Sequence, residues 1–128
     1  MPERENSGSL TKTVLLADDE PTVRIVLERV LRLAGYRVIA TENGAEASAQ
    51  AEKHSGGIDV LISDVLMPGV NGVELAKHLQ ESRPDTKVLL ISGYFPDGLE
   101  FREGWRFLRK PFSPVVLTQA LESLLQAA

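Results

Sequence analysis

The chain has 128 residues, of which 14 are basic and 18 are acidic, and its formal net charge is -4. It is 43% hydrophobic and 25% charged, close to globular averages, and this length predicts one domain. The acidic balance argues against direct nucleic-acid binding, the absence of cysteine excludes disulfide and thiolate chemistry, and no apolar run is long enough to cross a membrane.

The chain begins with a polar stretch, residues 1–12, with the sequence MPERENSGSLTK. This composition predicts a flexible lead-in or linker, so we expect residues 13–128 to form the folded domain. The stretch has no apolar signal-peptide core, and we therefore expect a cytoplasmic protein.

A short apolar strand is predicted at residues 13–17, and an acidic turn, Asp18-Asp19-Glu20, follows it at once. Pro21 suits the first position of a helix, and Gly35 is expected to end that helix. Apolar residues between them recur at helical spacing and form one stripe: Val23, Val26, Leu27, Val30, Leu31 and Ala34.

Later apolar runs predict four more strands, at residues 37–40, 58–64, 87–92 and 106–109. Further helices are predicted at residues 45–54, from an Asn71 cap to about residue 82, and from Ser113-Pro114 to the C-terminus. Strands that alternate with helices predict a doubly wound α/β domain with a five-stranded parallel sheet. Right-handed crossovers would place all strand C-termini on one edge of that sheet.

Polar side chains collect at this edge. Asp18 and Asp19 follow the first strand, Asp64 ends the third, Ser92 ends the fourth and Lys110 follows the fifth. If the sheet has the flavodoxin-like order 2-1-3-4-5, the first and third strands are neighbours and three carboxylates converge. An all-oxygen cluster of this kind suits Mg²⁺. A carboxylate nucleophile, a divalent metal, a lysine and a hydroxyl are together suited to phosphoryl transfer.

Each of these residues also has an ordinary structural explanation. Asp18 and Asp19 before Pro21 could serve only to cap the helix, Ser92 could be a loop hydroxyl, and Lys110 could be a solvated surface lysine. These explanations do not account for the position of all of them on the same edge.

Four stretches carry a family resemblance: VLLADDEP, DVLISDVLMPGVNGVEL, VLLISG and FLRKPF. In this order and spacing they resemble a two-component response-regulator receiver domain, over nearly the whole chain from Thr13. The resemblance implies the flavodoxin-like strand order 2-1-3-4-5.

The resemblance implies that Asp64 is the phosphoacceptor, taking a phosphoryl group from a phosphohistidine of a histidine kinase or a histidine phosphotransfer domain. It also implies a Mg²⁺ site made by Asp18, Asp19, Asp64 and the backbone carbonyl of Leu66. In that site Asp19 would bind the metal directly and Asp18 through water.

The resemblance further implies that Ser92 is the switch hydroxyl that closes on the phosphoryl group and that Lys110 pairs with that group. The Lys110–Pro111 bond would be cis. Phe107 matches the switch aromatic that turns inward when the hydroxyl moves, although core packing is an equally good explanation of a Phe at this position.

The connection between the fourth and fifth strands departs from the family pattern. It has only 13 residues, 93–105, and Pro96, Gly98 and Gly104 interrupt it, so we expect the fourth helix to be shortened or missing. Because this helix helps to form the usual dimer surface of the family, dimerisation stays an open question. The SGY and FLRKPF pattern resembles receivers of hybrid histidine kinases, in which residues 1–12 would be the linker.

Two classes of function fit this reading. The first is a signalling switch, with no enzymatic activity beyond self-phosphorylation from phosphodonors and slow autodephosphorylation. The second is a small phosphatase-like enzyme with Asp64 as nucleophile. Such an enzyme usually needs a cap domain, and the chain is too short to hold one beside the predicted fold. A degenerate receiver that serves only as a binding module is a third alternative, and the complete set of acidic, hydroxyl and lysine residues argues against it.

Overall fold

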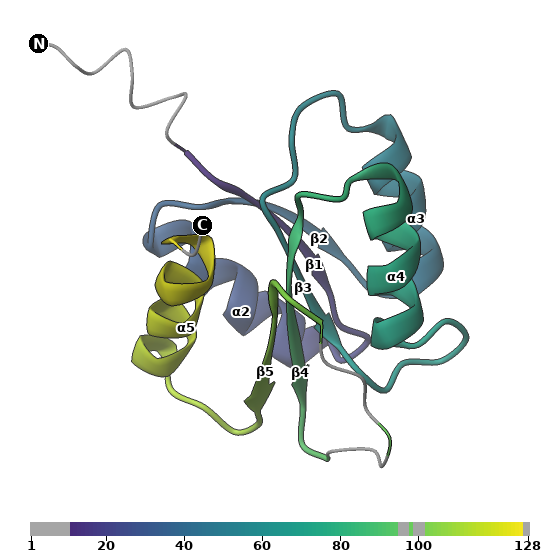
Figure 1. The fold of residues 1–128 in the computed structure, drawn as a ribbon. Coiled ribbons are helices and arrows are strands. Elements are labelled where there is room, and N and C mark those ends of the chain that lie inside the picture. The colour runs from purple at the N-terminus through teal and green to yellow at the C-terminus, as the bar shows by residue number, and fades with distance from the viewer. Residues whose placement is uncertain (1–10, 95–97, 99–101, 127–128) are drawn as a thin grey trace, which may run out of the picture.

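The computed structural model describes residues 11–94, 98 and 102–126. In this part of the chain, five parallel strands form one sheet in the order β2-β1-β3-β4-β5, with helices on both faces (Figure 1). The strands are β1 (Thr13–Ala17), β2 (Arg37–Thr41), β3 (Val60–Asp64), β4 (Lys87–Ser92) and β5 (Trp105–Arg109). The helices are α2 (Pro21–Leu33), α3 (Gly44–Lys53), α4 (Gly72–Ser82) and α5 (Pro114–Gln126). The predicted doubly wound architecture and strand order are confirmed.

The core consists of two apolar layers, one on each face of the sheet. Helices α3 and α4 contribute Ala47, Ala51, Leu75, Ala76 and Leu79 to one layer. Helices α2 and α5 contribute Leu27, Leu31, Leu117, Leu121 and Leu124 to the other. Every residue of β1 and β3 is buried, as expected for central parallel strands that are covered on both faces. No helix in the described ranges is long and apolar enough to cross a membrane.

Helix α2 ends as its sequence predicts. Gly35 has a φ of 99°, a conformation that costs glycine little, and its N–H donates to the carbonyl of Arg32 at 3.0 Å. The N–H of Tyr36 donates to the carbonyl of Leu31 at 3.0 Å, which completes a helix-terminating pair of hydrogen bonds. This turn sends the chain directly into β2.

The start of α4 is held close to the end of β3. The Asn71 side chain accepts the N–H of Glu74 at 2.9 Å, and the Glu74 carboxylate accepts the N–H of Asn71 at 3.3 Å, which is a complete capping box. A Cβ atom built on Gly72 would overlap the carbonyl oxygen of Asp64. Glycine at this position therefore allows the helix to approach the strand that ends at Asp64.

Strand β3 begins two residues later than predicted, at Val60. The preceding residue, Asp59, accepts the N–H of Thr13 on its side chain at 2.7 Å, while its own N–H donates to the Thr13 carbonyl at 2.9 Å. Asp59 thus closes the N-terminal end of the β1–β3 pair. The remaining element boundaries agree with the predicted ones to within one or two residues.

None of the described residues between β4 and β5 is helical, which agrees with the predicted shortened or missing helix. Residues 95–97 and 99–101 lie outside the described part of the chain. Beyond this connection, Trp105 opens β5 and is nearly buried. Its indole N–H donates to the Gln80 side chain at 3.0 Å, and the Arg102 guanidinium carbon lies 5.5 Å from its ring centroid.

We predict that Gly72→Ala lowers the free energy of unfolding. Alanine has a better helix propensity by up to about 1 kcal/mol, but its Cβ has to displace the backbone of Asp64, and overpacking of this kind typically costs about 1–3 kcal/mol. Urea unfolding would measure the difference. Gly57→Ala is the matched control, since a Cβ there meets nothing within 4 Å and its stability should hardly change. Equal stability of both variants would contradict the proposed close approach.

Candidate functional site

The carboxylate of Asp64 stands at the C-terminal edge of the sheet with both oxygens engaged. Oδ1 accepts the backbone N–H of Leu66 at 3.0 Å, and Oδ2 accepts the Lys110 ammonium at 2.9 Å. The side chain of Asp64 is only 10% exposed. Its orientation is therefore set by one backbone donor from its own loop and one charged donor from the end of β5.

Asp18 lies at the end of the neighbouring strand, and its side chain is fully buried. Its Oδ1 accepts the backbone N–H of Glu20 at 2.9 Å, and its Oδ2 accepts the Lys110 ammonium at 3.2 Å. Burial raises the pKa of Asp18 above its usual value, against the opposing effects of the Glu20 N–H and Lys110. The charged form of this carboxylate is thus stabilised by its neighbours but remains costly.

Lys110 joins the two strand ends. Its backbone N–H donates to the Ser92 carbonyl at 2.9 Å, and its ammonium contacts Asp64, Asp18 and, at 3.7 Å, Glu20. Burial by itself would lower the pKa of Lys110, but the hydrogen bonds and charges of Asp64 and Asp18 outweigh it and raise the pKa. The Lys110–Pro111 bond is cis, as predicted.

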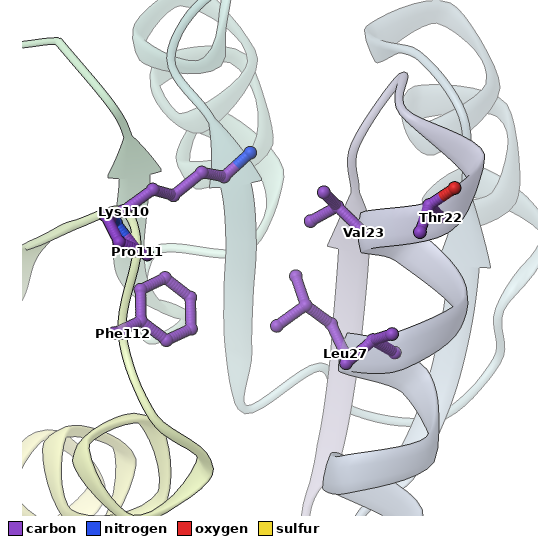
Figure 2. Close-up of a pocket in the computed structure, with 7 residues that line it drawn as sticks. Thr22, Val23, Leu27, Lys110, Pro111 and Phe112 are labelled. Atoms are coloured by element: carbon purple, nitrogen blue, oxygen red, sulfur yellow. The ribbon is translucent and has the colours of Figure 1, made fainter.

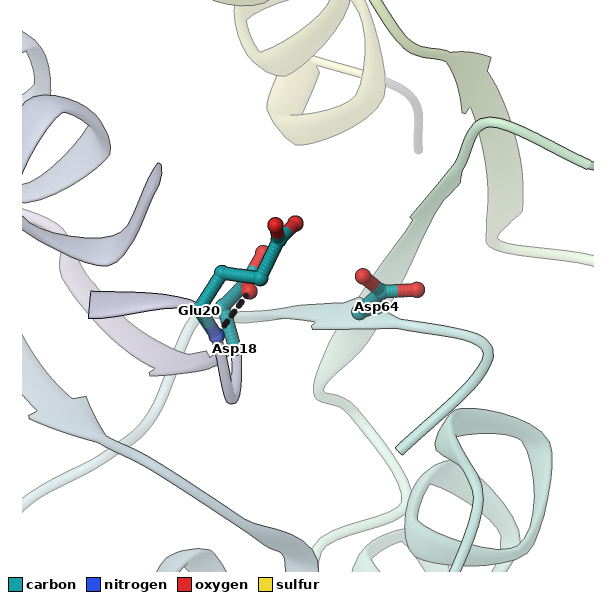
Figure 3. Close-up of side chains that lie close together, drawn as sticks. All are labelled: Asp18, Glu20 and Asp64. Atoms are coloured by element: carbon teal, nitrogen blue, oxygen red, sulfur yellow. Dashed lines mark hydrogen bonds between the residues drawn. The ribbon is translucent and has the colours of Figure 1, made fainter. Parts of the chain in front are cut away.

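Three carboxylates form an acidic group at this edge: Asp18, Glu20 and Asp64 each place an oxygen within 4.8 Å of the others (Figure 3). The three negative charges face one ammonium, so two of them are left uncompensated by Lys110. A compact set of oxygen ligands with excess negative charge suits a hard divalent cation such as Mg²⁺. These residues therefore fit a metal ion.

Glu20, and not the predicted Asp19, completes this group. The chain bends at Asp19, and across this bend the N–H of Glu20 donates to Asp18 Oδ1 at 2.9 Å. The carboxylates of Asp18 and Glu20 thereby both belong to the group, while that of Asp19 lies outside it. Three consecutive acids do not show from the sequence alone which of them turn toward Asp64. A direct metal contact by Asp19 stays a prediction.

Ser92 and Phe107 lie on the adjoining strands. Ile91 pairs with Asp64 across the sheet, so Ser92 stands one residue beyond it at the same edge, buried, with its Oγ accepting the N–H of Tyr94 at 3.2 Å. Phe107 is half-buried and packs against the apolar layer of α3 and α4. Both predicted switch residues are thus near the edge, outside the acidic group itself.

An apolar groove of about 270 Å³ adjoins the site between α2 and the segment after β5 (Figure 2). Its lining residues are Thr22, Val23, Val26, Leu27, Lys110, Pro111 and Phe112. Lys110 lines this groove and its ammonium also contacts Asp64, so the groove adjoins the acidic group through this lysine. The sequence did not predict this groove.

In a comparison with protein families, the model of the response regulator receiver domain matches residues 14–122. Sensor kinase CckA of Brucella abortus (strain 2308) is 35% identical over an alignment of 128 residues that covers 97% of this chain and 14% of that kinase. The response regulator receiver protein CpdR of the same organism is 34% identical over an alignment of 122 residues that covers 91% of this chain and 99% of CpdR. The chain therefore spans a small part of one relative and nearly all of the other.

Solved structures give the same picture. The receiver domain of the hybrid histidine kinase CckA has 38% sequence identity and a TM-score of 0.79, covering 89% of this chain and 99% of that one. The response regulator TrrA from Thermotoga maritima, in complex with Mg²⁺ and BeF, has 31% identity and a TM-score of 0.78 over 89% of this chain and 99% of that one.

We predict that Asp18→Asn raises the melting temperature at neutral pH in the presence of a chelator. The folded pKa of Asp18 is raised above 3.8, so the folded state binds this proton more tightly than the unfolded state. As the pH rises from 3.8 through the folded pKa, the contribution of Asp18 to the stability of the fold therefore falls, and at neutral pH it is unfavourable. Asparagine removes the buried charge and keeps an acceptor for the Glu20 N–H.

Thermal unfolding at neutral pH and again near pH 4 would measure the effect, which should shrink at the lower pH. Asp85→Asn is the control, because Asp85 is exposed and outside the acidic group. A lower melting temperature for Asp18→Asn than for wild type at neutral pH would contradict the prediction.

Proposed function

Because the chain belongs to the family of response regulator receiver domains, we propose that Asp64 accepts a phosphoryl group from a phosphohistidine. The donor would be a histidine kinase or a histidine phosphotransfer domain. A receiver domain is a phosphoacceptor signalling switch and not a classical enzyme. The observation that carries the assignment to Asp64 is its nearly buried carboxylate, which is fixed by Lys110 and the Leu66 N–H beside two further carboxylates.

The transfer needs little from the protein beyond positioning and charge neutralisation. An oxygen of Asp64 forms the new bond to phosphorus as the bond from phosphorus to the donor imidazole nitrogen breaks, and the imidazole keeps the electron pair. Lys110 already contacts Asp64, so it can follow the arriving phosphoryl oxygens without a large movement. Ser92 at the same edge supplies a hydroxyl that can donate to those oxygens once it releases Tyr94.

Asp18, Asp64, Glu20 and the Leu66 carbonyl would hold Mg²⁺, with Asp19 as a further candidate. When bound there, Mg²⁺ would supply positive charge against the negative charges of Asp64 and the incoming phosphoryl group. The chain's own part is to hold the carboxylates together before the donor arrives. The TrrA complex with Mg²⁺ and BeF supports the choice of metal by analogy.

The added phosphoryl group carries nearly two negative charges, which explains how it could act as a switch. It would draw Lys110 and the Ser92 hydroxyl toward Asp64. Because Lys110 and Ser92 are joined through their backbones at the ends of β4 and β5, their movement would be transmitted to Phe107, which pairs with Leu90 in the register of these strands. Phe107 would then turn further inward.

The phosphohistidine has to reach Asp64 over the C-terminal edge of the sheet. The apolar groove beside Lys110 is the surface that such a partner would meet first (Figure 2). Its lining includes Val26 of α2, which is exposed. The two relatives leave open whether this receiver is linked to a kinase, as residues 1–12 would allow, or stands alone. We also propose that the receiver domain consists of residues 13–128.

We predict that acetyl phosphate or phosphoramidate with Mg²⁺ adds one phosphate to the wild type and none to Asp64→Asn. The amide cannot form an acyl phosphate, while its size leaves the Leu66 and Lys110 contacts nearly in place. Intact-mass spectrometry would detect the phosphate, and mild alkali should remove it. Asp85→Asn, on the exposed surface, is the control and should be phosphorylated normally. Incorporation of phosphate into the Asp64→Asn variant would refute the assignment.

The lifetime of the phosphoryl group should be long. We propose that two exposed side chains flank the approach of a hydrolytic water: Leu66, with 54% exposure, and Tyr94, with 59%. Leu66 cannot orient a water by hydrogen bonding. We predict that Leu66→Asn speeds phosphate loss several-fold, because the amide can orient the attacking water. The effect should be smaller than that of a full general base, which is about 10²–10⁴-fold. Tyr94→Ala tests the second position. Phosphate release from the purified phosphoprotein gives the rates, and unchanged rates in both variants would show that the lifetime is set elsewhere.

A further inference from the structure

The acidic turn between β1 and α2 lacks the usual helix cap. Glu20 occupies the N-cap position of α2, but its side chain makes no capping hydrogen bond, and Pro21 at the next position has no N–H to offer. The Glu20 carboxylate lies in the acidic group with Asp18 and Asp64 instead. The Glu20 side chain therefore does not fix the start of the helix, and the turn is held by the bond from the Glu20 N–H to Asp18 Oδ1 and by a second contact from α2.

Arg24 supplies such a contact. Its Nη1 donates to the backbone carbonyl of Asp18 at 2.8 Å, from one turn into α2, while its own N–H donates to the carbonyl of Glu20 at 2.9 Å. On the opposite side, the N–H of Asp18 donates to the carbonyl of Thr41 at 3.2 Å. The peptide groups on both sides of Asp18 are therefore tied, one to β2 and the other to a charged, half-buried guanidinium.

The carbonyl that Arg24 holds belongs to the peptide between Asp18 and Asp19. Rotation of this peptide would redirect the chain through Asp19 and Glu20 and would move the Glu20 carboxylate away from Asp64. Mg²⁺ demands nearly ideal octahedral geometry, so small displacements of its ligands weaken its binding. We propose that Arg24 is a positioning residue of the metal site, which keeps the Asp18 and Glu20 carboxylates beside Asp64 through its bond to the Asp18 carbonyl.

This inference rests on the proposed function, because it concerns the Mg²⁺ site of that function. Charge and position make opposite predictions for Arg24. A guanidinium near the site repels a divalent cation, so removing a mere charge would strengthen Mg²⁺ binding. Removing a positioning contact weakens it, as does the loss of other groups that orient metal ligands, typically by about 10–100-fold.

Isothermal titration calorimetry of Mg²⁺ at constant ionic strength separates these effects. Arg24→Gln should bind Mg²⁺ about tenfold more weakly than wild type. Arg24→Lys, which keeps a donor of nearly the same reach, should recover part of the loss. Arg29→Gln is the matched control, since it removes the same charge from an exposed position on the same helix and should leave the affinity unchanged or slightly higher.

Thermal unfolding with a chelator accompanies each titration and shows that the variants are folded. Mg²⁺ affinity in Arg24→Gln equal to or above that of wild type would overturn the inference, even if its stability falls. An Arg24→Lys variant no better than Arg24→Gln would also speak against the bond to the Asp18 carbonyl. Failure of the wild type to bind Mg²⁺ would overturn the proposed function itself, and the positioning role with it.

Discussion

Mutual repulsion between Asp18, Glu20 and Asp64 is the constraint around which the edge of the sheet is arranged. Charges this close cannot share a partly buried site unless a cation stands among them. The chain brings one, Lys110, from the end of β5, although β4 separates that strand from β3. The backbone bond from Lys110 to Ser92 fixes where the lysine leaves the sheet, and the loop after β3 adds the Leu66 N–H on the other side of Asp64. The parallel topology is what allows donors from distant parts of the chain to meet at this point.

The same arrangement places function and stability in opposition. Asp18 is a fully buried carboxylate with a raised pKa, and the fold would gain by neutralising it. Its charge is retained at the place where a divalent cation and a phosphoryl group are proposed to bind. The surrounding structure compensates with completely buried β1 and β3 strands and with two apolar layers that do not depend on the site. Burial of apolar side chains in the core thus offsets the electrostatic cost of the buried carboxylate at the edge.

Local patterns in the sequence predict the elements, and contacts between distant segments explain what they miss. The bounds of β1 and β4 follow from continuous apolar runs, because strands covered on both faces need them. The shortened or missing helix before β5 follows from the number of residues in that connection. In contrast, the later start of β3 depends on a bond between Asp59 and Thr13, and the need for glycine at position 72 depends on the backbone of Asp64. The place of Glu20 in the site depends on the path of one turn, which residue types alone did not define.

The position of Trp105 has a consequence for optical measurements on this protein. It is the chain's single tryptophan, and it stands at the opening of β5, five residues before Lys110 or about 16 Å along an extended chain. Its indole contacts Gln80 on α4 and Arg102 in the connection that carries no described helix. Intrinsic fluorescence therefore observes the end of the sheet opposite to Asp64. A change in emission on addition of a ligand at the acidic edge would be a record of structural change carried along the full length of the strand, with no direct quenching by the ligand to subtract.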